Sequence, residues 1–324
     1  MTEDKALTRP PIAPGARRSV AVVIPSFNME WCIERALASC LSQTHPPAEI
    51  IVVDDGSTDG TSHLMRGLML NEPRIRYERL SENQGHLPAL LRGMSCSTMD
   101  WTALLDADDE LTEDSLERRV AAAEEYHASS GEWPQLVYGD LYWERIAPGA
   151  LCRFKRIHGR DLRFLFRELS LCQTSTIMLG REVLLWFPEI ENPYNSDDEI
   201  VLTAASHSPI THCGAPVAVT HAYESDASSS PHNARRRLRG IAKLVRDHRH
   251  DIMREHGARR FLLWRLRVLR AFLEWQSGWA RQQPQAKCFF MSLRWAFRLY
   301  ARLTNGLHSC LTVFLEKHFE QMYF

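Results

Sequence analysis

The chain has 324 residues, enough to bury the core of one large domain and to carry an appendage. Its formal net charge is −1, so it lacks the basic excess that points to a nucleic acid partner. The eight cysteines form no C-x-x-C pair and no zinc-type spacing with histidine, which favours reduced thiols in a cytoplasmic protein. No apolar run approaches the roughly 20 residues that a membrane-spanning helix needs.

The first predicted elements alternate between strand and helix. Residues 1–18 are rich in proline and charge, and we expect a flexible tail there. An apolar, β-branched run at 20–24 predicts a buried strand, and the apolar spacing over 30–43 predicts a helix. A second buried strand is predicted at 50–53, followed by another helix. This alternation predicts a parallel sheet with crossover helices.

Polar loops follow both strands, and a third polar loop follows a further apolar run at 101–105. Three carboxylates open that third loop: Asp106, Asp108 and Asp109. Because the carboxyl ends of parallel strands meet at one edge of a sheet, we expect the three loops to converge. Crowded acids repel one another, so a bound cation or hydrogen bonds must offset the repulsion. The pattern favours a divalent-metal site that holds a phosphorylated ligand.

Other interpretations of this acidic segment are open. The carboxylates would also suit the start of a helix, where acids interact favourably with the helix dipole. An EF-hand loop beginning at Asp106 is excluded, because its sixth position needs glycine and holds Leu111. A phosphatase-type aspartyl nucleophile is not excluded by the local sequence.

The second half of the chain offers two features. Ser196, Asp197 and Asp198 stand before a helical pattern of apolar residues, where Ser196 or Asp197 could cap the helix. From residue 233 to 324 the chain is helical in pattern, basic and rich in tryptophan. Helices of this kind suit the membrane interface, packing on the preceding domain, or a dimer interface, and all three interpretations stay open.

The chain resembles the family 2 inverting glycosyltransferases, which have the GT-A fold. The motifs that carry the resemblance are VVIPSFN at 22–28, IVVDDGSTDGT at 51–61, NQG at 83–85 and LDADD at 105–109. The resemblance spans about residues 19–230. It implies an α/β fold with a single Rossmann-like, mostly parallel sheet and a C-terminal α-helical extension. The implied catalytic domain is 19–232, divided into a nucleotide-binding half at 19–110 and an acceptor half at 111–232.

The resemblance also assigns roles to individual residues. The implied catalytic base for the acceptor hydroxyl is Asp197, with Asp198 as the neighbouring alternative. The implied metal ligands for Mn²⁺ or Mg²⁺ are Asp106, Asp108 and Asp109. The implied contacts to the nucleotide sugar are Pro25, Phe27, Asn28, Asp55, Asn83 and Asp106.

Two functional classes follow. The first is a metal-dependent inverting enzyme that moves a sugar from a nucleotide diphosphate sugar to a hydroxyl group. The expected nucleotide is UDP. The acceptor would be a glycan or lipid-linked molecule in polysaccharide, glycolipid or glycan assembly. The second is a nucleotide-sugar-binding scaffold without turnover. It would act through its helical tail, and it is suggested by YESDASSS at 223–230, where many relatives carry Tyr-Arg-x-His. His221 and His232 flank this segment, and either is a candidate ligand or proton donor.

A nucleotidyltransferase ranks third, since no Gly-rich basic loop follows the first strand. We expect a cytoplasmic location. Residues 233–324 could provide a surface for peripheral contact with the inner face of a membrane, or an interface for a homo-oligomer. The sugar, the acceptor and the linkage depend on pocket shape and are not predicted.

Overall fold

The computed structural model describes residues 18–144, 148–154, 156–159, 172–186 and 196–221, except the side chains of 196–199 and 202. The expected tail, apart from Arg18, and the expected helical extension at 233–324 therefore lie outside the described residues. No helix within the described ranges is long and apolar enough to cross a membrane.

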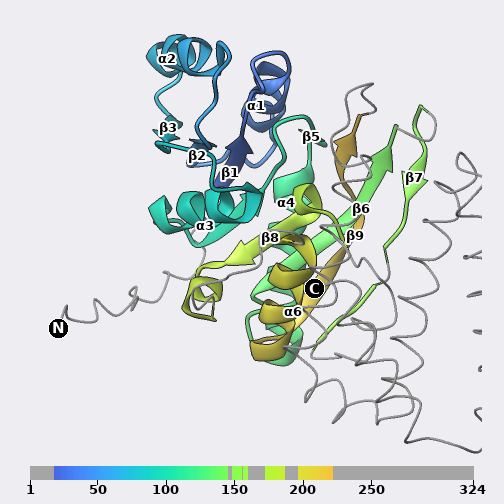
Figure 1. Cartoon of the computed structure of the whole chain (residues 1–324). Helices are drawn as coiled ribbons and strands as arrows, with labels where there is room; N and C mark the ends of the chain where they lie inside the picture. Colours follow the sequence, from blue (N-terminus) through green and yellow to red (C-terminus); the bar gives the residue numbers. More distant parts are fainter. Residues whose placement is uncertain (1–17, 145–147, 155, 160–171, 187–195, 222–324) are drawn as a thin grey trace, which may run out of the picture. The chain divides into compact units, whose positions relative to one another are not determined.

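The N-terminal half follows the predicted alternation (Figure 1). The two predicted strands are confirmed as fully buried segments, because every residue of both is shielded from solvent. The predicted helix at 30–43 is shorter, since residues 29–32 form a turn in which the N–H groups of Cys32 and Ile33 bond to the carbonyl of Met29. The elements of this half are β1 (Val20–Ser26), α1 (Ile33–Leu41), β2 (Glu49–Asp54), α2 (Thr61–Asn71), β3 (Ile75–Arg79), α3 (His86–Cys96) and β4 (Trp101–Leu104).

The second half continues the same sheet with a different connectivity. Its elements are β5 (Glu110–Leu111), α4 (Ser115–Ser130), β6 (Leu136–Trp143), β7 (Leu151–Cys152), a 3-10 turn (Thr174–Thr176), β8 (Ile177–Gly180), a second 3-10 segment (Arg181–Trp186), α6 (Ser196–His207) and β9 (Ile210–Thr220). The nine strands of the described residues run in the order β3-β2-β1-β4-β8-β6-β9-β5, with β7 paired to β6.

The sheet is parallel in one half and mixed in the other. Strands β3, β2, β1 and β4 are all parallel neighbours, as expected. Beyond β4, β8 runs antiparallel to both β4 and β6, β9 is parallel to β6, and β5 is antiparallel to β9. The expected mostly parallel sheet thus describes the nucleotide-binding half, and the second half departs from it.

Helices cover both faces of the parallel half. The face formed by Val20, Val22 and Ile24 packs in one core cluster with buried residues of α1, α2 and α4. The opposite face receives α3, where a Cβ added at Gly93 would lie 2.4 Å from a methyl carbon of Val23. This double cover explains why β1 and β2 are apolar at every position instead of alternating.

Candidate functional site

Asn28 is one of the residues that join the loops after β1 and β2. The Asn28 side-chain oxygen accepts hydrogen bonds from the Thr58 N–H (2.8 Å) and hydroxyl (3.3 Å). The Asn28 N–H in turn donates to Ser57 Oγ at 2.9 Å. Asn28 also adopts a left-handed backbone conformation with φ 57°, which asparagine tolerates better than most residues. Asn28, predicted to contact the nucleotide sugar, therefore shapes the loop that would do so.

The adjacent acids of β2 and its loop both turn inward. Asp54 is fully buried, accepts the Ser57 N–H at 2.7 Å and accepts the Tyr77 hydroxyl. Burial and this hydrogen bond to a carboxylate raise the pKa of Tyr77. Asp55, 3% exposed, accepts the backbone N–H groups of Gln84 and Gly85 with its two oxygens, each at 2.7 Å. Asp55 thus connects the β2 loop to the segment that precedes α3.

The remaining predicted nucleotide contacts differ in exposure. Pro25 is buried within β1, whereas Phe27 is 39% exposed directly after that strand. Asn83 is exposed. A flat, half-open ring beside buried backbone is suited to stacking against a planar base, since aromatic rings favour such offset contacts.

The three acids after β4 do not share one environment. Asp106 is half-buried, with 31% of its side chain exposed, and its Oδ1 lies 2.7 Å from Nε2 of His86. Asp108 is half-buried. Asp109 is 5% exposed, and its Oδ2 accepts the hydroxyl of Ser175 at 2.6 Å. The same Ser175 oxygen accepts the Asp106 N–H at 3.1 Å, so the serine fixes the turn from two sides.

Basic groups from distant elements lie beside these acids. Arg35 of α1 donates to the carbonyl oxygen of Asp108 at 2.9 Å and pairs with Glu110 at 3.1 Å. Arg35 therefore brings a positive charge to the acidic turn, and His86 gives Asp106 one of the hydrogen bonds that can offset the repulsion between the acids. Burial of the nearby Cys32 thiol, followed by the Asp108 charge, raises the pKa of that thiol to about 12, which favours its protonated form.

His221, which follows β9, joins this network from the other half of the sheet. Its Nε2 lies 2.7 Å from Glu110, and its Nδ1 lies 3.1 Å from Glu144. The ring therefore lies between the carboxylate of Glu110 in β5 and that of Glu144, which directly follows β6. His232 and the segment 223–230 are outside the described residues.

Comparison with known proteins identifies the family. The family model described as glycosyl transferase family 2 matches residues 21–186, just over half of the 324. The chain belongs to glycosyl transferase family 2.

Curated relatives match about a third of the chain. TuaG of Bacillus subtilis (strain 168), a glycosyltransferase named for teichuronic acid biosynthesis, is 37% identical over 101 residues, which cover 31% of this chain and 40% of TuaG. The succinoglycan biosynthesis protein ExoO of Rhizobium meliloti (strain 1021) is 34% identical over 105 residues, 32% of this chain and 30% of ExoO. The match spans less than half the length of these relatives.

Solved structures of TarS from S. aureus share the fold. The structure of TarS 1–349 in complex with UDP has a TM-score of 0.52 at 19% identity, covering 69% of this chain and 64% of that one. The structure in complex with UDP-GlcNAc has a TM-score of 0.53 at 15% identity, covering 79% and 81%. At these identities the likeness shows the fold.

The expected catalytic pair lies at a helix start, as predicted. Helix α6 begins at Ser196, so Asp197 and Asp198 stand in its first turn. The side chains of residues 196–199 are outside the description, so their catalytic role stays a prediction.

The structure adds residues that the sequence did not single out. His86, Ser175 and Arg35 all contact the acidic turn after β4. In the sequence, the position of His86 directly after the NQG motif is the one feature that could have pointed to a role in the site. Ser175 and Arg35 carried none, because neither belongs to a motif with a recognisable spacing.

Proposed function

We propose that this family member transfers a sugar from a UDP-linked donor to a hydroxyl acceptor, with inversion and with the help of a divalent metal ion, in glycan assembly. The observation that carries the proposal is the pair Asp106 and Asp108. Both are half-buried at the carboxyl end of β4, next to the loops of β1 and β2. That edge is where open α/β sheets hold their ligands.

The donor base would lie against the β1 and β2 loops. Phe27 offers a ring face, and Asp55 retains lone pairs that could accept the imide N–H of uracil, since each carboxylate oxygen accepts more than one hydrogen bond. TarS, which shares the fold, has been solved with UDP and with UDP-GlcNAc, and this supports the choice of UDP.

The carboxylates at this edge of the sheet are suitable ligands for a hard divalent cation. No three His, Cys, Asp or Glu side chains form a metal cage among the described residues. Mg²⁺ commonly needs only one or two carboxylates, because substrate phosphates and water complete its shell. Asp106 and Asp108 supply that number, while the carboxylate of Asp109 already accepts the hydroxyl of Ser175. A metal bound there would screen the charge on the leaving diphosphate.

The acceptor hydroxyl needs a base on the other side of the sugar. Asp197, with Asp198 beside it, opens α6 and is our candidate. A carboxylate in hydrogen-bond reach of the hydroxyl would take its proton as the new bond to the sugar forms. The acceptor is a glycan or a lipid-linked glycan, brought near by membrane or subunit contacts of residues 233–324.

Donor binding is tested by thermal shift with UDP and UDP-GlcNAc, each with and without Mn²⁺. A ligand that binds the folded protein stabilises it by about 2.7 kcal/mol at 100 times its dissociation constant. We expect this Mn²⁺-dependent shift in the wild type and its loss in Asp106→Ala and Asp108→Ala. Glu125→Ala, which removes an exposed acid of α4, is the matched control and should keep the shift. Equal shifts in all four proteins would show that the metal assignment is wrong.

The base is tested separately by the rate at which UDP is released from the donor in the presence of acceptor glycans. Asp197→Asn should keep the thermal shift and lower kcat by about 10²–10⁴-fold, because an amide cannot take the proton. If Asp198→Asn has that effect instead, the base is the neighbouring residue. If neither substitution slows transfer, the pair only caps α6.

A further inference from the structure

A pocket lies at the opposite edge of the sheet from the acids that follow β4. Its lining includes Trp101 at the start of β4, Gln135 just before β6, and Pro209 just before β9. The cavity measures about 610 Å³. Asp106 follows the other end of β4, so this pocket is separated from the proposed donor site by the length of the strand, on the order of 15 Å.

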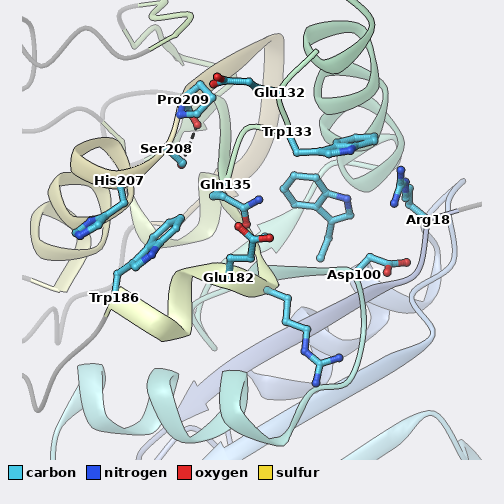
Figure 2. A pocket seen from close by; sticks show the side chains of 13 residues that line it. Arg18, Asp100, Glu132, Trp133, Gln135, Glu182, Trp186, His207, Ser208 and Pro209 are labelled. Carbon is cyan, nitrogen blue, oxygen red and sulfur yellow. Dashed lines mark hydrogen bonds between the residues drawn. The ribbon is translucent and has the colours of Figure 1, made fainter. Parts of the chain in front are cut away.

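Aromatic rings form two sides of this pocket (Figure 2). On one side, Trp133 stacks on His127 at 4.0 Å, and the Arg18 guanidinium lies 4.0 Å from its centroid. Trp101, 4% exposed, meets Trp133 edge to face at 6.4 Å. These contacts fix that wall in place.

Trp186 forms the facing side. It is half-buried, and the His207 ring stacks on it at 5.0 Å with an interplanar angle of 9°. His207 is itself held by a hydrogen bond between its Nδ1 and the carbonyl of Thr203 at 2.9 Å. Figure 2 shows Trp186 between His207 and the side chains of Gln135 and Glu182, all of which line the pocket.

A buried hydrogen-bond acceptor lies between the two walls. Gln135 is 9% exposed, and its Oε1 has no hydrogen-bond partner among the described residues. The amide fits there because position 180 is glycine: a Cβ on Gly180 would lie 2.1 Å from that oxygen. A buried carbonyl oxygen without a donor is unfavourable, so a ligand that donates a hydrogen bond to it is favoured.

The chemistry of the lining selects the class of ligand. The pocket lining holds two guanidiniums and three carboxylates (Asp100, Glu132 and Glu182). This excess of negative charge disfavours a phosphate ligand. A purely apolar ligand would leave the Gln135 oxygen unsatisfied. A sugar ring satisfies both requirements, because its hydroxyl groups donate to amide and carboxylate oxygens while its C–H face packs on an indole.

We propose that this pocket is a carbohydrate-binding site that holds a sugar unit of a glycan apart from the donor edge. Trp186 provides the face on which the sugar packs, and Gln135 accepts one of its hydroxyl groups. The site binds free saccharide without nucleotide or metal, so it does not depend on the proposed transfer reaction.

The test is isothermal titration of the full chain, without UDP or metal, with chitotetraose, cellotetraose and maltotetraose. We expect at least one to bind, and Trp186→Ala and Gln135→Leu each to weaken binding by about tenfold or more. Leu185→Ala is the matched control, because Leu185 is 63% exposed, adjacent to Trp186 and outside the lining.

The same variants are measured for folding by circular dichroism and for the thermal shift with UDP and Mn²⁺. Because Trp186 is half-buried in a short segment, its variant keeps the test valid if Gln135→Leu fails to fold. No binding of any of the three saccharides to the wild type at about 10 mM would overturn the proposal. So would equal affinity of Trp186→Ala and wild type. Loss of the UDP shift in every protein would instead count against the donor site alone.

Discussion

At the residue scale, carboxylates in similar sequence motifs differ in their burial and in their hydrogen bonds. Asp54, Asp55 and Asp109 are buried and accept hydrogen bonds from the chain itself. Asp106 and Asp108 remain half-exposed at the same edge. A buried carboxylate that accepts hydrogen bonds from the protein organises the loops, whereas a half-exposed carboxylate is open to a cation.

The structural role of Asp55 gives a prediction at this scale. Asp55→Ala leaves the N–H groups of Gln84 and Gly85 without their acceptor, and we expect the free energy of unfolding to fall by about 1–3 kcal/mol. Urea denaturation measures the change. Asn83→Ala, at an exposed neighbouring position, is the control and should stay within about 0.5 kcal/mol of wild type. An unchanged midpoint for Asp55→Ala would show that this connection does not stabilise the fold.

At the scale of elements, the approach of α3 to the sheet depends on one glycine. A Cβ at Gly93 would lie 2.4 Å from Val23 and 3.0 Å from Val53, on neighbouring strands β1 and β2. His86 is the first residue of α3, so the position of this helix on the sheet also determines where the His86 ring contacts Asp106. Close packing of a helix on a sheet leaves little room for even one methyl group.

Two glycine substitutions in helices test this packing. Gly93→Ala should lower the free energy of unfolding by about 1–3 kcal/mol through overpacking against β1 and β2. Gly67→Ala in α2 is the matched control, because nothing lies within 4 Å of the added carbon. It should raise stability by up to about 1 kcal/mol, since alanine is the better helix former. The comparison is made by urea denaturation, and equal effects of the two substitutions would contradict the packing argument.

At the scale of the whole molecule, a buried hydrogen bond between a histidine and an aspartate joins two strands of the mixed half of the sheet. The Asp140 carboxylate of β6 accepts the Phe154 N–H at 2.8 Å and lies 3.1 Å from Nε2 of His212 in β9. His212 Nδ1 accepts the Gly214 N–H at 2.8 Å, so the neutral ring satisfies both partners. Burial lowers the pKa of His212 from 6.5, although Asp140 opposes the shift.

This arrangement predicts a pH dependence of global stability. A histidine whose pKa is lower in the folded state binds protons more readily when unfolded, so stability is full above pH 6.5 and falls as the pH drops below it. We expect the melting temperature to decrease from pH 7 to pH 5 and His212→Gln to reduce that slope. His63→Gln, at an exposed position of α2, is the control. An unaltered slope in His212→Gln would contradict the assignment.

The local features of the fold could be read from the sequence alone. Apolar runs predicted β1, β2 and β4, and short motifs placed the polar loops at one sheet edge and indicated the family. These predictions succeed because each depends on neighbouring residues: a strand buried on both faces must be apolar throughout, and a tight loop needs its glycines.

Only the tertiary structure decided which acids face a ligand and what lies beside them. Arg35 reaches Asp108 across 73 positions of sequence, and Ser175 reaches Asp109 across 66. The mixed strand order of the second half and the tryptophan-lined pocket likewise join segments far apart in the chain. Burial and charge compensation are sums over everything that packs around a side chain, and no local pattern contains those distant contributors.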